Sequence, residues 1–412
     1  MFGGRKTMRN RLNSPLPSFF APAPEALLSA PRPGPHPLEV YDITYLHFHD
    51  NLELGVCVSG QGACQVEGVL YPFAAGDVRA LFGAEFLARW AEGDARVFNL
   101  ETVLSDGGAP LPKAGPNLRA PAECAAGLRA LAPSAICLAN NHAMDFGAPG
   151  LRATQKALSG LNTFGAGETL AQASQAQILG DAAIYACAER EFGIADIAAP
   201  GTNPFDPLES FDAVAALRAQ GHRVIVLYHG GLEKYRYPSP NLRRVCRKFV
   251  EKGADLVLCQ HSHSVGCREA YQGKTIVYGQ GNLLFARYSD EHWNTGLLIG
   301  VDTRDMRPVF VPLERREGGV RVSTDASILE GFEARSREIA REGFVEEAFA
   351  QRAARADYEK KLFGRLGRYV RKLGLCERLM DEPSAAGVVN LLECDAHREL
   401  AAQMLRQKYL KG

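Results

Sequence analysis

Ala135-Ile-Cys-Leu-Ala-Asn-Asn-His-Ala-Met-Asp-Phe-Gly147 predicts a buried strand that ends in a cluster of polar residues. The apolar run at 136–139 is the strand, and a helical segment follows at 151–158. The polar residues between them are Asn140, Asn141, His142 and Asp145. Side chains with metal-binding or proton-transfer chemistry at a strand end are typical of a functional site in an α/β sheet.

The composition is that of an ordinary soluble globular protein, with 46% hydrophobic and 23% charged residues in 412. This length allows one large core or two domains. The formal net charge is +0, so electrostatics give no reason to expect a nucleic acid or an anionic membrane as a partner.

The ten cysteines show no CxxC motif and no regular spacing. Cys137, Cys187 and Cys259 lie in apolar runs, where a free cysteine packs as a small hydrophobic residue. This pattern favours a reducing, cytoplasmic compartment. We see no secretory signal before Pro15 and no run long enough to span a membrane.

Three regions are expected along the chain. Residues 1–38, rich in Pro, Ala and Ser, predict a disordered leader. Residues 39–320 predict an α/β domain, because strands and helices alternate there. Residues 321–412 predict a helical C-terminal region. The expected strands are 52–59, 97–100, 136–139, 184–187, 224–228, 256–259, 275–278 and 297–301. The expected helices are 76–90, 125–131, 151–158, 211–220 and 241–252.

Four of the expected strands end in polar residues of the kinds that bind metals. These residues are Asn99 and Glu101; Asn141, His142 and Asp145; His229; and Gln260, His261 and His263. Carboxylate, imidazole and amide oxygen together suit one or two divalent ions such as Mn, Fe or Zn. Two such ions about 3.5–4 Å apart would hold a phosphate and activate water.

Each motif alone has a structural explanation. His229 could be a hydrogen-bonded structural residue, and Asn140–His142 could be a helix cap and turn. His261 and His263 are two residues apart, so in an extended segment both imidazoles would face one centre. Arg236 could contact an anionic substrate or lie in a solvated loop, and His397 fits an amphipathic helix packed on the core. Only the joint occurrence of the strand-end motifs favours a metal site.

Six ordered motifs between about Gly76 and Phe285 resemble the CapA family of poly-gamma-glutamate capsule biosynthesis proteins. They are Asn99-Leu-Glu101, Ala139-Asn-Asn-His-Ala-Met-Asp-Phe-Gly147, Tyr228-His-Gly-Gly231, Gly253-Ala-Asp-Leu-Val257, Gln260-His-Ser-His263 and Tyr278-Gly-Gln-Gly-Asn282. The segment Leu391–Glu399 is similar to a subgroup of that family. The resemblance implies a four-layer αββα sandwich of the calcineurin-like metallophosphoesterase type, with a helical C-terminal extension.

The resemblance also implies roles for individual residues. The metal ligands would be Glu101, Asn141, His229, His261 and His263. The catalytic residues would be His142, which stabilises the leaving oxygen, and Asp145. Asn99, Asn140, Glu233, Arg236 and Asn282 would contact the substrate. The implied reaction is metal-assisted hydrolysis or transfer at a phosphate or acyl-phosphate centre. The substrate would be an anionic small molecule or polymer, and the partners would be capsule-synthesis proteins.

The first strand departs from the family pattern. Family members end this strand in Gly-Asp, whereas this chain has Gly60-Gln61, and glutamine supplies no anionic ligand. The pair Gly76-Asp77 is explained more simply as a helix cap. One metal position would then be weak or empty. The alternative is a non-catalytic protein that keeps the fold for binding or assembly.

A second pattern overlaps the same region. His47, His49 and Glu53, followed by Gly60, resemble the first motif of cupins, including sensor domains of AraC-type regulators. Too few residues separate Leu38 from Gly76 to close a double-sheet cupin. Residues 39–75 are therefore expected to be a divergent or cupin-like start of the domain, and a cupin-fused sensor is a further alternative.

Overall fold

The computed structural model describes residues 81–111, 113, 115–285, 291–316, 319–355 and 382–409. It also describes the backbone of three short strands, β1 (Phe20–Ala21), β2 (Gln61–Val66) and β3 (Val69–Ala74), which pair in that order. The expected strand at 52–59, the cupin-like residues, Asp77 and nearly all of the expected leader lie outside the described residues.

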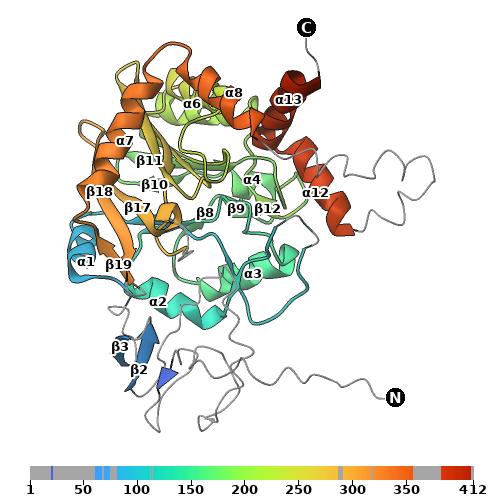
Figure 1. Ribbon diagram of the computed structural model, residues 1–412. Helices are drawn as coiled ribbons and strands as arrows, with labels where there is room; N and C mark the ends of the chain where they lie inside the picture. Colours follow the sequence, from blue (N-terminus) through green and yellow to red (C-terminus); the bar gives the residue numbers. More distant parts are fainter. Residues whose placement is uncertain are drawn as a thin grey trace, which may run out of the picture.

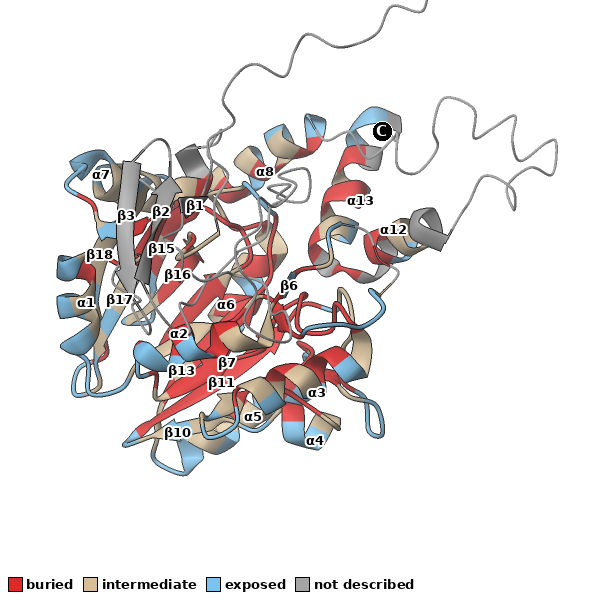
Figure 2. Ribbon diagram, turned by 90° about the horizontal axis from the view of Figure 1, so that it is seen from below, coloured by how far each residue is buried: buried red, intermediate tan, exposed pale blue. Residues whose placement is uncertain are grey.

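A six-stranded sheet forms the centre of the molecule, in the order β10-β11-β13-β14-β16-β15 (Figure 1). Its strands are β10 (Gln177–Leu179), β11 (Ala182–Ala188), β13 (Arg223–His229), β14 (Leu256–Gln260), β15 (Val265–Tyr271) and β16 (Lys274–Gln280). The four inner strands are parallel, and the edge strands β10 and β15 are antiparallel to their neighbours. Parallel strands are normally covered on both faces, and Figure 2 shows β11 and β13 deeply buried.

Two smaller sheets form the second β layer. One is parallel, in the order β4-β7-β8, with β4 (Val97–Asn99), β7 (Ala135–Cys137) and β8 (Thr163–Phe164). The other is the antiparallel β17 (Thr295–Asp302), β18 (Arg307–Arg316) and β19 (Gly319–Val322). Two short pairs complete the strands: β5 (Val103–Leu104) with β6 (Arg119–Ala120), and β9 (Ala166–Gly167) with β12 (Gly201–Thr202).

The packing of β7 defines the layers. Ala135 and Cys137 face a core shared with the six-stranded sheet, where they pack with Ile184, Leu227 and Leu258. Ile136, on the opposite face, packs with residues of the outer helices. These helices are α2 (Ala125–Ala130) and α3 (Gly147–Ala157), preceded by the short 3-10 helix η2 (Ala122–Cys124).

The other face of the six-stranded sheet is covered by α5 (Glu209–Ala219) and α6 (Pro240–Glu251), whose Val214 and Phe249 are fully buried. The α4 helix (Leu170–Ala173) caps the β9–β12 pair, and η3 (Glu291–Asn294) precedes β17. The expected four-layer αββα sandwich is therefore confirmed, with its second β layer divided between two sheets.

The C-terminal part is helical, as expected. Its helices are α7 (Ala326–Ile339), α8 (Phe344–Ala354), α12 (Glu382–Glu393) and α13 (Asp395–Tyr409). A small core of Phe349, Leu400 and Met404 joins α8 and α13 to Leu232, in the loop after β13. No helix among the described residues is long and apolar enough to cross a membrane.

Two details differ from the sequence-based expectation. Helix α1 (Ala84–Ala91) begins eight residues after Gly76, because the backbones of Leu81 and Gly83 form hydrogen bonds with Val320 on β19. The strands β15, β18 and β19 were not expected, because their mixed polar and apolar residues give no clear alternation.

Candidate metal centre

The candidate ligands come from the carboxyl ends of four strands, two in each β layer. Glu101 follows β4 and Asn141 follows β7, both in the three-stranded parallel sheet. His229 ends β13, and His261 follows β14, in the six-stranded sheet. The rim expected from the strand ends is therefore shared by two sheets, and the site lies across the sandwich.

The ligand atoms converge on Nε2 of His229. This nitrogen lies 3.0 Å from Oδ1 of Asn141, 3.2 Å from Nδ1 of His261 and 3.5 Å from Oε1 of Glu101. Nε2 of His263 lies 3.8 Å from the same Glu101 oxygen. Bonds of about 2.1 Å to a metal would separate neighbouring ligand atoms by about 3.0–3.5 Å. The spacing thus matches a divalent ion held between these side chains.

Glu101 carries a buried negative charge that lacks a fixed cation. Its side chain is 11% exposed, and Oε1 makes no hydrogen bond, nor does Nδ1 of His229. Burial opposes ionisation of Glu101, but the neighbouring imidazoles of His229 and His263 outweigh it and hold the carboxyl pKa well below its ordinary value. A buried carboxylate oxygen without a hydrogen bond is costly unless a cation fills the gap, so these residues fit a metal.

His261 and His263 both have left-handed backbone conformations, with φ of 84° and 51°. They reach the centre through this turn and not through the extended alternation expected from the sequence. Such conformations are unfavourable for residues other than glycine and gather at functional sites. Burial lowers the pKa of both imidazoles, which favours the neutral, metal-binding form.

Asn282 and Trp293 fix the ring of His263. Oδ1 of Asn282 lies 2.8 Å from Nδ1 of His263, while the amide nitrogen donates to the carbonyl of Trp293 at 3.0 Å. The Trp293 ring stacks on the imidazole at 4.4 Å. With Nδ1–H donated to Asn282, the lone pair of Nε2 faces Glu101. Asn282 therefore orients a candidate ligand, and its contact with a substrate stays a prediction.

His142 belongs to a buried triad with Asp145 and Lys113. Nδ1 of His142 lies 2.7 Å from Oδ2 of Asp145, and Lys113 forms an ion pair with the other carboxylate oxygen. The backbone N–H of Leu118 also donates to Oδ2 at 2.5 Å. Asp145 is fully buried, whereas the His142 side chain is 10% exposed. The carboxylate thus holds the imidazole with Nε2 directed away from the triad.

Asn140 is 0% exposed and ties the two ligand-bearing loops of the parallel sheet together. Its amide nitrogen donates to Oδ1 of Asn99 and to the carbonyl of Leu100, and its Oδ1 accepts from the N–H of His142. The side chain of Asn140 therefore makes its hydrogen bonds to groups of the protein itself.

Glu233 and Arg236 lie in the loop after β13. Glu233 is exposed, and its charge acts on both His261 and His263, so it lies beside the centre. The charge of Arg236 acts on Arg335 of α7. The structure thus brings Glu233 close to the two histidines, and the contact of Arg236 with a substrate stays a prediction.

Sequence reasoning missed Lys113 and Glu191. Lys113 lies in a turn-rich loop with no recognisable motif, and only the fold brings it to Asp145. Glu191 follows β11 in the same way that the predicted ligands follow their strands, so the strand-end rule could have found it. Its charge acts on His261.

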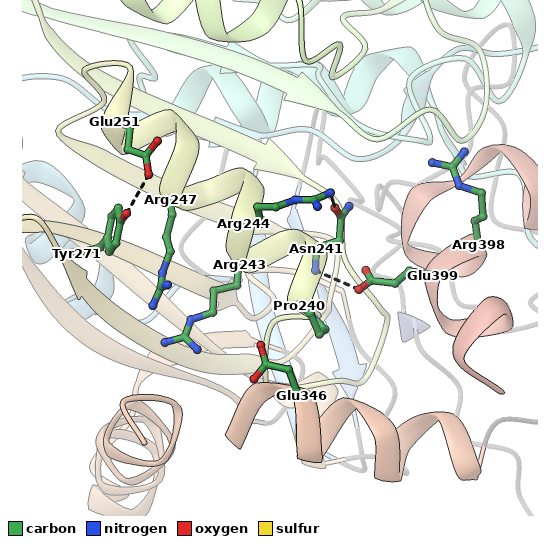
Figure 3. Close-up of a pocket in the computed structure, with 10 residues that line it drawn as sticks. All are labelled: Pro240, Asn241, Arg243, Arg244, Arg247, Glu251, Tyr271, Glu346, Arg398 and Glu399. Atoms are coloured by element: carbon green, nitrogen blue, oxygen red, sulfur yellow. Dashed lines mark hydrogen bonds between the residues drawn. The ribbon is translucent and has the colours of Figure 1, made fainter. Parts of the chain in front are cut away.

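A cavity of about 960 Å³ lies apart from this centre, at the start of α6 (Figure 3). Its lining includes Arg243, Arg247 and Glu399, and none of the five candidate ligands. Arg243 and Arg247 both bond to Glu269. The chemistry of the candidate ligands therefore marks the functional site better than the size of this cavity does.

The candidate ligands lie in the part of the chain that matches a known protein family. The chain matches the family described as bacterial capsule synthesis protein PGA_cap over residues 62–287, more than half of its length. That range contains all the candidate ligands.

Three curated relatives are similar at lower identity. The PGA biosynthesis protein CapA of Bacillus subtilis is 28% identical, over 38% of this chain and 42% of its own. The capsule biosynthesis protein CapA of Bacillus anthracis is 27% identical, over 46% and 49%. A probable polyglutamine synthesis accessory protein of Mycobacterium tuberculosis is 29% identical, over 46% and 55%. The chain thus spans about half the length of the curated relatives it matches.

A crystal structure of a Thermus thermophilus protein aligns with 55% of this chain and 90% of its own, at 14% identity and a TM-score of 0.31, too low to support an argument. The family match covers the strand-end motifs, and the αββα fold holds them together. The chain belongs to the bacterial capsule synthesis family PGA_cap.

Proposed function

We propose that this protein is a metal-dependent hydrolase of the phosphoesterase type that serves poly-gamma-glutamate or capsule biosynthesis. The observation that carries the proposal is the convergence of Glu101, Asn141 and three histidines on one point. The names of the curated relatives support the pathway. The substrate class would be an anionic phosphate or acyl-phosphate compound, including a polymer end.

The side chains divide the chemistry between them. A bound Mn, Fe or Zn ion, alone or as one of two, would supply Lewis-acid polarisation of the substrate and a more acidic water molecule. Glu101 would supply the anionic oxygen ligand of the ion, and Asn141 would supply an amide oxygen. His142, oriented by Asp145, donates a proton or a hydrogen bond to the leaving oxygen. Lys113 forms an ion pair with the buried carboxylate of Asp145.

A non-catalytic binding or assembly protein is the second candidate. It is favoured by Gln61, which begins β2 where the family resemblance calls for an aspartate. The described metal-type group that contains His263 has a single carboxylate, Glu101. One occupied position would suffice to bind an anionic polymer without turnover. The cupin-fused sensor has no support among the described residues, because His47, His49 and Glu53 lie outside them.

The compartment and partners follow from the same proposal. The seven cysteines in the described part of the chain are all buried and free, which is in keeping with a reducing cytoplasm. Capsule-synthesis proteins are the proposed partners.

Metal content and turnover of the purified full chain test the proposal together. We expect bound Mn, Fe or Zn and hydrolysis of a generic aryl phosphate ester. His142→Ala should abolish turnover and keep the metal, while the matched control His222→Ala, on a turn remote from the site, should change neither. Metal without turnover under all three ions would favour the binding protein. A metal content undiminished from that of the wild type in a His229→Ala, His261→Ala double variant would refute the site itself.

A further inference from the structure

A second group of metal-type side chains lies where the C-terminal helices meet the sheet. Glu191 follows β11, Cys394 lies between α12 and α13, and His397 is in the first turn of α13. One ligand atom from each lies within 4.8 Å of the others, and Nε2 of His397 is 3.8 Å from Oε1 of Glu191. No function assigned above uses these three residues.

The side chains around Glu191 indicate a binding position for an ion. Its side chain is 9% exposed and accepts a hydrogen bond from Nδ2 of Asn390 at 3.3 Å. Asn390 is itself only 8% exposed, and its Oδ1 is buried without a hydrogen-bond partner. A buried polar atom with no partner calls for an explanation, and an ion beside Glu191 supplies one.

Helix α13 is fixed in place from two sides. Oε1 of Glu399 accepts from the backbone N–H of Asn241, at the start of α6 (Figure 3). Oε2 of Glu399 accepts from the hydroxyl of Ser239, which caps the same helix. Ala396, Leu400 and Met404 pack in the small core with Phe349. His397 therefore sits on a docked helix, two residues from its anchor.

We propose that Glu191, Cys394 and His397 form a second metal site, which takes a borderline-soft divalent ion of the zinc class. Thiolate, imidazole and carboxylate are the ligand types that zinc prefers, and three protein ligands leave a fourth position open. This site goes beyond the proposed hydrolase function and stands without it.

The geometry requires a small adjustment. Ligand atoms around tetrahedral zinc are about 3.3–3.8 Å apart, so the group must contract by up to about 1.5 Å from its present spacing. Sγ of Cys394 now donates to Oε2 of Glu189 at 3.7 Å. On metal binding the sulfur–hydrogen bond breaks, the electron pair stays on sulfur to form the metal bond, and the proton leaves to Glu189 and then solvent.

The site would link the C-terminal helices to the rim of the metal centre. Cys394 and His397 come from the helical region, whereas Glu191 follows a strand of the central sheet and acts on His261. Binding would therefore hold the helices against the sheet by the energy of metal coordination.

Cobalt substitution of the metal-free full-length protein tests this site. A cobalt–thiolate bond gives a near-ultraviolet charge-transfer band that the first centre, which has no sulfur ligand, does not produce. We expect the band in the wild type, its loss in Cys394→Ser, and its retention in the controls His263→Ala and Cys124→Ser. His397→Ala and Glu191→Gln should each weaken cobalt binding at this site by at least 10-fold, since each removes one ligand.

The same titration can overturn the proposal. It fails if saturating cobalt gives no band in the wild type, or if the band persists in Cys394→Ser. If circular dichroism shows that Cys394→Ser is unfolded, His397→Ala decides. An unchanged cobalt affinity, measured from the charge-transfer band, refutes the site, and a weaker affinity supports it. The hydrolase proposal depends on His142 and His261, so either proposal can fail alone.

Discussion

Glu101 and Glu269 are both buried carboxylates on the sandwich, and they differ in what neutralises them. Oε1 of Glu269 accepts from Arg243 at 2.9 Å and from Arg247, and Oε2 accepts from the hydroxyl of Tyr278 at 2.7 Å. Oε1 of Glu101 makes no hydrogen bond and faces imidazoles. Glu269 is satisfied by the protein's own cations, so its role is structural. Oε1 of Glu101 has no such partner, so Glu101 can bind a metal ion.

Replacing Glu101 should have the largest effect of all. Glu101→Gln removes the carboxylate among the five candidate ligands, so we expect kcat/KM to fall by at least about 10³-fold, or about 4 kcal/mol of transition-state stabilisation. The metal content should fall with it. A Glu101→Gln protein that keeps its full metal content would contradict the proposal that Glu101, unlike Glu269, binds the metal.

Asp145 tests whether His142 depends on its orientation. Asp145→Asn should lower kcat by about 10²–10³-fold while leaving metal content unchanged, because the asparagine does not hold the reacting tautomer of the imidazole. It also leaves Lys113 without its carboxylate.

The double variant Lys113→Met, Asp145→Asn separates these two effects. It should regain the stability lost in Asp145→Asn, since no buried charge is left unpaired. Its turnover should stay low. Recovered turnover would show that Asp145 acts only through folding.

Asn282 gives a smaller effect on the same centre. Asn282→Ala frees the ring of His263, and loss of such an outer partner costs about 10–100-fold in metal affinity. Isothermal titration of the metal-free protein measures it. Asn282→Asp keeps the acceptor for Nδ1–H and should retain most of the affinity. Equal metal affinities in the wild type, Asn282→Ala and Asn282→Asp would show that Asn282 does not support metal binding.

Glu269 provides the opposite case, a carboxylate whose loss affects stability alone. Burial works against its ionisation, but the hydrogen bonds from Arg247, Arg243 and Tyr278 outweigh it and hold the pKa of the carboxyl below its ordinary value. Its contribution to stability is therefore present above about pH 4.3, the ordinary value, and is lost as the pH falls through the lower pKa of the folded protein.

Glu269→Gln should accordingly unfold about 2 kcal/mol more easily at pH 7. The difference from the wild type should shrink as the pH falls below about 4. Urea unfolding at several pH values measures both. Metal content and turnover at pH 7 should be unchanged, and a loss of metal would contradict the separation of the two carboxylates.

The alternation of strands and helices predicted an α/β domain, and the family resemblance implied its αββα layers. The five candidate ligands could be proposed from the sequence because each ends or follows an apolar strand, as His229 ends β13. The partners of those ligands were not predictable. Lys113 reaches Asp145 from a loop without periodicity, and α13 reaches α6 through Glu399, far along the chain. Such contacts depend on how loops and helices pack over the ends of the strands, and no local sequence pattern predicts that packing.

The backbone of His261 and His263 shows a similar limit. The spacing His-x-His predicts that the two rings can meet, and they do lie 6.0 Å apart. The left-handed turn that brings them together could not be inferred, because a positive φ is uncommon for any residue other than glycine, histidine included.

The division of the ligands between two sheets has a consequence for residues that never touch the centre. The distance between Asn141 and His229 is set by how the β4-β7-β8 sheet sits on the six-stranded sheet, through the core that contains Phe164 and Leu227. Metal affinity is thus a measure of the relative position of the two sheets. Substitutions in that core should change affinity by moving one half of the coordination sphere against the other, even where the protein stays folded.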